Sequence, residues 1–306
     1  MKILTNIITI FLVSTLVSCG GEGQQTPPNT GGGGGAPPPS PPISSPASFD
    51  TLVFEDQFAN GSLDRNVWNV VGPDFWVNNE QQAYIDSSDT IFFEAATGSE
   101  DDAVLVLKPE WREGYPTPTG RVVDFVSGRI NSRDNLDVTY AKVSARIRMP
   151  DAQGVWPAFW LLGYGSWPDS GETDIMEYVG EKEWTSSALH GPGYSGGESI
   201  GARNNFEDGA DVTDWHIYSV ERRTEDVRFF VDEEEFFRVT RAEVEERGEW
   251  RFDRAQHLIL NFALGGNYPQ GVNGVNSPYP GLPAATVDAI RANEIRMEVD
   301  WVRVWE

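Results

Sequence analysis

Short runs of alternating apolar and polar residues dominate the chain from residue 49 onward. In Lys142–Met149 and again in Ile295–Trp301, every second residue is apolar, the period of a strand that buries one face. Ala103–Leu107 is continuously apolar, as expected of a strand covered on both faces. Three further short runs, separated by turn-like residues, span 216–221, 227–231 and 235–239. Helical periodicity is scarce, with one short turn expected at Val287–Ala292. This pattern, with 31 Gly and 20 Pro, predicts an all-β sandwich of two antiparallel sheets.

The segment Gly171–Tyr178 places three carboxylates within six residues of an apolar, β-prone run: Glu172, Asp174 and Glu177. Acidic residues are depleted in strands, because a desolvated carboxylate is costly unless it is paired. Glu172 and Asp174 share one face of a regular strand, whereas Glu177 would point the opposite way. A β-bulge near Ile175-Met176 would return Glu177 to the shared face. Three acids would then line one groove, as the cleavage of a glycosidic bond by two carboxylates requires. The alternative is a solvent-facing acidic strand without chemistry.

Tryptophan residues cluster just before this acidic segment. In a strand that begins at Trp156, the residues Trp156, Ala158 and Trp160 share one face. If that face borders the groove, the indoles provide flat platforms for sugar rings, and Trp167 in the following loop is a third candidate. The alternative is that the indoles belong to the core, since tryptophan is usually well buried.

The ends and the charge of the chain constrain its location and its partners. Lys2, an apolar stretch and Cys19 make residues 1–19 similar to a lipoprotein signal peptide, with Cys19 as the lipidated residue. Residues 20–48 are rich in Gly and Pro and are expected to form a disordered linker, followed by one domain, 49–306. We therefore expect an exported protein that is anchored through Cys19 to a membrane of the bacterial cell envelope and exposed at its surface. A plain secretory signal is the alternative.

The net charge of −24 argues against nucleic acid, anionic lipid and sulphated polymers as main partners.

The domain resembles glycoside hydrolase family 16, and within it the bacterial laminarinase-like endo-β-1,3-glucanases. The resemblance extends from Leu52 to Trp305 and depends on many short motifs in order. Those before the tryptophan cluster are Phe54–Phe58, Asn79–Tyr84, Ser127–Ile130 and Ala145–Ile147. The strongest are Trp156–Trp160 and Trp167–Gly180, and the last are Leu189–Tyr194, Leu258–Gly266 and Val299–Val304.

This resemblance implies a concanavalin A-like jelly roll with a concave substrate cleft and a retaining double displacement. Glu172 would attack the anomeric carbon, and Glu177 would protonate the departing oxygen and then activate water. Asp174 would tune Glu172 through a hydrogen bond or a shared proton. No cofactor is expected for catalysis. Close carboxylates cannot all ionise freely, so at least one pKa should be raised.

The resemblance also implies residues that bind the sugar. His190 would lie beside the cleavage point, where it would bind sugar hydroxyls or Asp174, unless it only packs within a strand. Asn79, Glu80 and Arg129 match family positions on the sugar-binding side, although Asn79 also suits a plain turn. The loops at 110–126 and 194–214 could narrow one end of the cleft.

Family members often bind a structural calcium ion on the convex face, and Asp300 matches the acid that does so. Gln57 and Gly98 would offer backbone carbonyls, a set of oxygen ligands that suits calcium. Gln57, however, replaces a residue that is commonly acidic in the family.

Several functions remain open on the sequence alone. The first is hydrolysis of a β-1,3-glucan such as laminarin by a monomeric enzyme. The same mechanism could act on mixed-linkage glucan, agarose or another galactan, or transfer the sugar to an acceptor other than water. A non-catalytic carbohydrate-binding protein is the alternative from another class, and the presence of all three acids argues against it.

Overall fold

The computed structural model describes residues 45, 48–100 and 103–306. The predicted signal segment with Cys19, and all of the predicted linker except residues 45 and 48, lie outside the described residues, so export and lipid anchoring remain predictions. Within the described part of the chain, no helix combines the length and the apolar character needed to cross a membrane.

The fold is built on two large sheets, and adjacent strands within each of them are antiparallel. In sheet A, the strand order is β17-β16-β15-β10-β19-β5-β4, and β1 also pairs with β19. The strands of sheet A are β1 (Leu52–Asp56), β4 (Ile91–Glu94), β5 (Val104–Leu107), β10 (Lys142–Arg148), β15 (His216–Arg222), β16 (Asp226–Val231), β17 (Glu234–Thr240) and β19 (Met297–Trp305).

In sheet B, the strand order is β14-β13-β12-β11-β18-β8-β2, and β9 also pairs with β18. Its strands are β2 (Asn69–Val70), β8 (Arg129–Asn131), β9 (Asp137–Val138), β11 (Val155–Gly163), β12 (Glu172–Glu177), β13 (Trp184–His190), β14 (Ile200–Asn205) and β18 (Gln256–Leu264).

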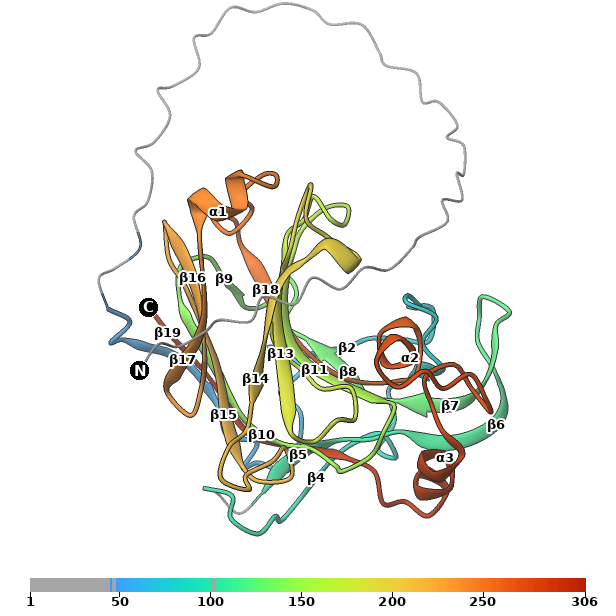
Figure 1. Cartoon of the computed structure of the whole chain (residues 1–306). Helices are drawn as coiled ribbons and strands as arrows, with labels where there is room; N and C mark the ends of the chain where they lie inside the picture. The colour runs from blue at the N-terminus through green and yellow to red at the C-terminus, as the bar shows by residue number, and fades with distance from the viewer. Residues whose placement is uncertain (1–44, 46–47, 101–102) are drawn as a thin grey trace, which may run out of the picture.

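A third, smaller sheet and a few short helices complete the fold. The small sheet consists of β3 (Gln82–Tyr84), β7 (Val122–Ser127) and β6 (Glu110–Pro116). The helices are the 3₁₀ turn η1 (Gly196–Glu198), α1 (Arg241–Glu245), α2 (Asn267–Asn273) and α3 (Ala284–Arg291). Figure 1 shows α2 and the β6–β7 hairpin beside the β8 end of sheet B.

The two large sheets enclose one hydrophobic core. Val143 and Ile147 of β10 and Phe159, Ile175 and Met176 of sheet B all belong to a single cluster of buried side chains. The opposite face of sheet B carries Glu172, Asp174 and Glu177, and we call it the acidic face. The predicted all-β sandwich is confirmed, and the expected helical turn near 287–292 is the end of α3.

Arg222 links the two sheets at one end of the sandwich. Its side chain is fully buried at the end of β15. The guanidinium donates hydrogen bonds to the carbonyl oxygens of Val138 (2.9 Å), Phe252 (3.2 Å) and Arg254 (2.8 Å). Because these carbonyls belong to β9 and to the loop before β18, one side chain of sheet A fixes the backbone beside two strands of sheet B.

Replacing Arg222 with methionine should therefore destabilise the whole sandwich. The substitution leaves buried carbonyl oxygens without donors, and we expect a loss of about 2–4 kcal/mol in the free energy of unfolding. Urea unfolding followed by tryptophan fluorescence measures it. Arg112→Met, which removes an exposed ion pair with Asp89, is the matched control and should cost less than about 1 kcal/mol. Equal losses in the two variants would contradict the proposed role.

Candidate active site

The predicted bulge in β12 is confirmed by the pairing of both neighbouring strands. On one side, Phe159 lies opposite Met176 while the next residue, Trp160, lies opposite Asp174, which leaves Ile175 as the extra residue. On the other side, Asp174 pairs with Ala188 and Glu177 with Ser186, so two residues of β12 face a single residue of β13. The backbone carbonyl of Ile175 accepts a hydrogen bond from the Ser187 hydroxyl at 2.6 Å.

The bulge follows from the sequence because two consecutive residues are apolar. Ile175 and Met176 are both buried in the core, with 2% and 0% of their surface exposed. A regular strand would point one of them toward the acidic face. With both turned inward, Glu177 lies on the same face as Glu172 and Asp174.

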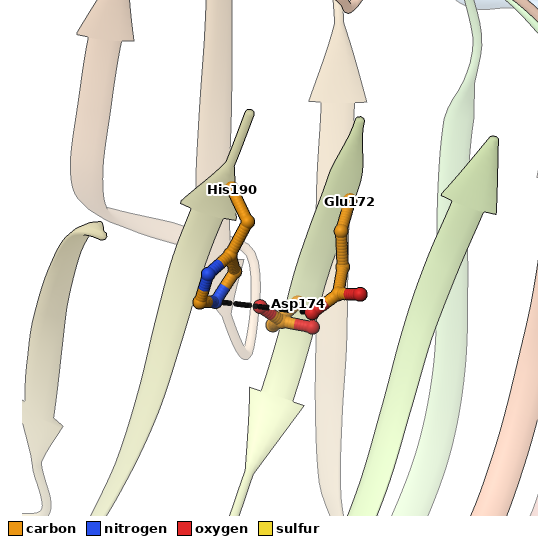
Figure 2. Close-up of side chains that lie close together, drawn as sticks. All are labelled: Glu172, Asp174 and His190. Carbon is orange, nitrogen blue, oxygen red and sulfur yellow. Dashed lines mark ion pairs between the residues drawn. The ribbon is translucent and has the colours of Figure 1, made fainter. Parts of the chain in front are cut away.

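His190 of β13 lies against two of these carboxylates, as Figure 2 shows. Its Nε2 atom is 3.0 Å from Asp174 Oδ2 and 3.8 Å from Glu172 Oε1. The Gly196 backbone N–H donates to His190 Nδ1 at 3.1 Å, so a neutral ring carries its proton on Nε2, facing the acids. Asp174 Oδ2 nevertheless has no aligned hydrogen bond within the described residues, so its contact with His190 is electrostatic. His190 thus lies beside Asp174, and its role in binding sugar hydroxyls remains a prediction.

Burial dominates the electrostatics of the three acids. It raises the pKa of Glu172, of Asp174 and of Glu177 to about 8. Repulsion from Asp174 contributes to the raised pKa of both glutamates, while His190 opposes it. Because the acids are close together in a poorly solvated place, at least one of them holds a proton at neutral pH.

The two tryptophans of β11 lie on the acidic face, as predicted, but they make different contacts. The indole Nε1–H of Trp156 donates to Glu177 Oε1 at 3.0 Å, whereas that of Trp160 donates to Asn261 Oδ1 at 2.7 Å. Trp160 also packs against the Arg129 guanidinium, whose carbon lies 4.9 Å from the ring centre. Trp167 is half exposed, with its ring centre 6.0 Å from that of His190.

The predicted sugar-binding residues Asn79, Glu80 and Arg129 lie on the β8 side of the acids. Arg129 is buried and stacks on Phe75 at 4.0 Å. The buried Glu80 carboxylate accepts a hydrogen bond from Gln82 Nε2 at 2.7 Å. Burial raises the pKa of Glu80, while that hydrogen bond and the charge of Arg129 oppose the rise. Asn79 adopts a left-handed backbone with φ of 57°, which agrees with the turn that the sequence also allowed.

The β6–β7 hairpin, which contains the predicted loop 110–126, borders this side. Its Arg121 donates to the Gln82 carbonyl oxygen at 2.8 Å and stacks on Trp76 at 5.1 Å. A hollow of about 170 Å³ lies here, lined by Trp76, Asn79, Glu80, Gln81, Arg121, Val122, Val123, Asp124 and Tyr279. The other predicted loop, 194–214, is partly ordered as β14 at the edge of sheet B, next to His190.

Sequence reasoning missed Tyr268 and Asn261, which contact the tryptophans, and Ser186, which contacts Tyr268. Tyr268, the second residue of α2, packs edge-on against Trp156, with ring centres 5.5 Å apart and planes at 81°. Its hydroxyl is 3.0 Å from Ser186 Oγ. Ser186 and Asn261 could have been found from strand alternation, since they pair with Glu177 and Ala158, but no local pattern marks Tyr268.

Among the described residues, we consider two places as cation sites. Ligand atoms of Glu172, Asp174 and His190 all lie within 4.8 Å of one another, but a metal there would occupy the carboxylate predicted to be the nucleophile. The second place is Asp300, the predicted calcium ligand on β19. Asp300 forms an ion pair with Arg146 and accepts the Glu100 N–H at 2.9 Å.

The surroundings of Asp300 do not fit calcium as they stand. Trp215 packs between Arg146 and Arg148, with guanidinium carbons 4.9 and 4.8 Å from its ring centre, and donates to the Thr97 carbonyl at 3.0 Å. Gly98 lies against that indole. Among the described residues, no hydrogen bond or ion pair joins Asp300 to Gln57 or Gly98. A calcium ion would have to displace Arg146, and calcium binding remains an untested prediction.

Comparisons with known proteins agree on one family. The sequence profile of Glycosyl hydrolases family 16 matches residues 75–279. The Beta-glucanase of Rhodothermus marinus is 31% identical over 97% of this chain and 93% of that protein. The Glucan endo-1,3-beta-glucosidase A1 of Niallia circulans is 28% identical over 83% of this chain, which spans only 38% of that longer protein. The laminarinase catalytic domain of Thermotoga maritima MSB8 has a similar structure, with a TM-score of 0.70 and 30% identity over 83% of this chain and 97% of that one.

The stability of the protein should depend on pH through the acids. A carboxyl group whose pKa rises from about 4.5 to about 8 on folding destabilises the native state as pH increases between these values. We expect Glu177→Gln to stabilise the protein by about 1–2 kcal/mol at pH 8.5 and hardly at all at pH 4.5. Urea unfolding at both pH values measures this, with the exposed Glu207→Gln as control. A gain at pH 4.5 equal to that at pH 8.5 would contradict the predicted cause.

Arg146 should make the stability of the protein independent of calcium. We expect the melting temperature of the unchanged protein to be the same in a chelator and in excess calcium. Arg146→Met leaves Asp300 buried and unpaired, which should cost about 3 kcal/mol, and calcium should restore part of that loss. Arg65→Met, which removes an exposed ion pair with Asp86, is the control. A rise in melting temperature when calcium is added to the unchanged protein would show that the ion binds despite Arg146.

Proposed function

The chain belongs to glycosyl hydrolase family 16, and on this premise we propose that it is a retaining, endo-acting hydrolase of β-1,3-glucan. The observation that supports this most directly is the bulge in β12, which brings three acids to one face. The names of the relatives, a laminarinase among them, support the choice of substrate.

In the first step of the proposed mechanism, the Glu172 carboxylate attacks the anomeric carbon. The bond between that carbon and the glycosidic oxygen breaks, and Glu177 gives its proton to the departing oxygen. The product is a glycosyl ester on Glu172. Because the pKa values of all three acids are raised, at least one acid holds a proton near neutral pH. The mechanism places that proton on Glu177, as a general acid needs.

In the second step, the Glu177 carboxylate takes a proton from water as the water oxygen attacks the anomeric carbon. The ester bond breaks, Glu172 leaves as a carboxylate, and the configuration of the sugar is retained. Asp174 lies between the glutamates in sequence and raises the pKa of both. Its charge therefore helps to set which acid holds the proton.

The substrate side of the proposal depends on aromatic and polar side chains. Trp160, Trp167 and the hollow near Asn79 offer flat and hydrogen-bonding surfaces around the acids. The net charge of −24 argues against a sulphated polymer such as carrageenan. A non-catalytic binding protein would not need three buried acids, whose burial costs stability.

The test is incubation of the purified protein with laminarin, lichenan, agarose and κ-carrageenan, with product sizes and anomeric configuration followed over time. We expect laminarin to give short oligosaccharides that appear early and initially carry the β configuration. Glu172→Gln and Glu177→Gln should each lower kcat on laminarin by at least about 10³-fold, while Glu234→Gln, at an exposed position on β17 of sheet A, should leave it unchanged. Laminarin turnover that survives either active-site substitution would refute the mechanism, and turnover of agarose alone would refute the substrate.

A further inference from the structure

Trp156 was predicted to be a platform for sugar, yet its only polar atom is engaged elsewhere. The indole Nε1–H donates to Glu177 Oε1 at 3.0 Å. Resting on the proposed function, we infer that Trp156, supported by Tyr268 and Ser186, is a positioning residue that fixes which oxygen of Glu177 carries the acid proton. We call these three residues the Glu177 brace.

The chemistry of the indole gives the contact its direction. An indole N–H can donate a hydrogen bond but cannot accept one. In a protonated Glu177, the carbonyl oxygen is a much better acceptor than the hydroxyl oxygen, so the bond from Trp156 favours the proton on Oε2. After that proton has passed to the glycosidic oxygen, Oε1 still accepts from Trp156 and Oε2 is free to take a proton from water. One fixed donor thus serves both steps of the mechanism.

The indole is itself held from two sides. Its own strand, β11, pairs with both β12 and β18. From α2, Tyr268 packs edge-on against it, and the Tyr268 hydroxyl is 3.0 Å from Ser186 Oγ. Because Ser186 pairs with Glu177 across β12 and β13, the brace forms a closed path that begins and ends at Glu177.

The start of α2 fixes the position of Tyr268. Gly266, immediately before the helix, has a φ of 84°, and a Cβ atom there would lie 2.6 Å from the Asn78 carbonyl oxygen. Only glycine accommodates that approach at little cost. The next residue, Asn267, donates its backbone N–H to the same carbonyl at 2.8 Å. The helix start is thus attached to the turn at Asn78-Asn79, on the sugar-binding side.

Trp160 shows what a tryptophan on this face does without an acid as partner. It lies four residues along β11, and its indole N–H bonds to Asn261 while its ring packs on Arg129. The two indoles thus divide the work: Trp160 remains a candidate sugar platform, and Trp156 orients the acid.

The charged and titratable groups around Glu177 make its single donor important. Glu172 and Asp174 of β12, His190 of β13 and Tyr268 of α2 all interact electrostatically with it or with its neighbours. Among the described residues, Trp156 is the one hydrogen-bond donor to the Glu177 side chain. Losing that donor removes the one hydrogen bond that stabilises the Glu177 carboxylate, so the pKa of Glu177 should rise.

The test compares substrates whose leaving groups differ in their need for a proton. Trp156→Phe keeps an aromatic ring and removes the N–H. On laminarin, we expect kcat to fall about 10-fold with KM changed less than about 2-fold, and the alkaline limb of the kcat profile to move up by about 0.5–1 pH unit. The second substrate is a nitrophenyl β-laminaribioside, whose nitrophenolate leaving group needs little protonation. On it, kcat should fall less than about 3-fold.

Two further variants separate the support from the donor. Tyr268→Phe and Ser186→Ala each break the same hydroxyl contact, so each should lower kcat on laminarin about 2–5-fold, and the double variant should be no worse than either single one. Trp305→Phe, the same change on β19 of sheet A, is the control and should leave both substrates unaffected. A pure platform role predicts instead that Trp156→Phe raises KM on both substrates and leaves the pH profile unmoved, and that result would overturn the inference.

A second measurement keeps this inference separate from the proposed function. NMR titration of carbon-labelled glutamate reports the pKa of Glu177 in the unchanged protein and in Trp156→Phe without any turnover. If the unchanged protein cleaves none of the polysaccharides, the proposed function fails, but a rise in the Glu177 pKa in the variant would still support the brace. An unchanged Glu177 pKa in a folded Trp156→Phe protein would overturn it, whatever the activity.

Discussion

Two adjacent apolar side chains that both enter the core determine the chemistry on the other face of sheet B. Burying a side chain such as Ile175 or Met176 stabilises a protein by about 1.5–3 kcal/mol. A ladder hydrogen bond lost at a bulge costs about 1 kcal/mol, and the Ser187 hydroxyl replaces one by bonding to the Ile175 carbonyl. Core packing therefore outweighs regular pairing, and the extra residue brings Glu177 beside its two acidic neighbours.

The rest of the sandwich holds this arrangement against the repulsion that it creates. The acids are desolvated by their surroundings, which raises the pKa of each. The pairing of β12 with β11 and β13 holds the strand from both sides, and Arg222 links the two sheets at one end of the sandwich. The site is thus kept under electrostatic strain by packing elsewhere, and that strain makes an acid available near neutral pH.

Much of this could be predicted from local pattern, because strands repeat every two residues. The alternation of apolar and polar residues predicted strands β10 and β19. The spacing of Glu172, Asp174 and Glu177 predicted the bulge that β12 contains. Alternation also placed Trp156 and Trp160 on the acidic face. It could not show what their nitrogens bond to, since Asn261 comes from a distant strand and the partner of Trp156 depends on the bulge itself.

Contacts between residues far apart in the sequence could not be predicted from the local pattern. Tyr268 comes from a short helix whose position depends on the turn at Asn78, and the Asp300 partner Arg146 lies 154 residues away. Asp300 matched a family position, but a match at one residue says nothing about which cation faces it. Arg222 likewise looks like an ordinary surface arginine in an alternating strand, although the folded chain buries it completely.

The bulge also limits how this segment of the gene can vary over time. Deleting one residue between Asp174 and Glu177 would restore regular pairing of β12 and turn Glu177 toward the hydrophobic core. Adding one would enlarge the bulge and disturb the pairing that β12 makes with β11 and β13 on either side of it. Related sequences can therefore differ in the residues of β12 but not in its length. The β6–β7 hairpin and the edge strand β14, in contrast, can vary in length.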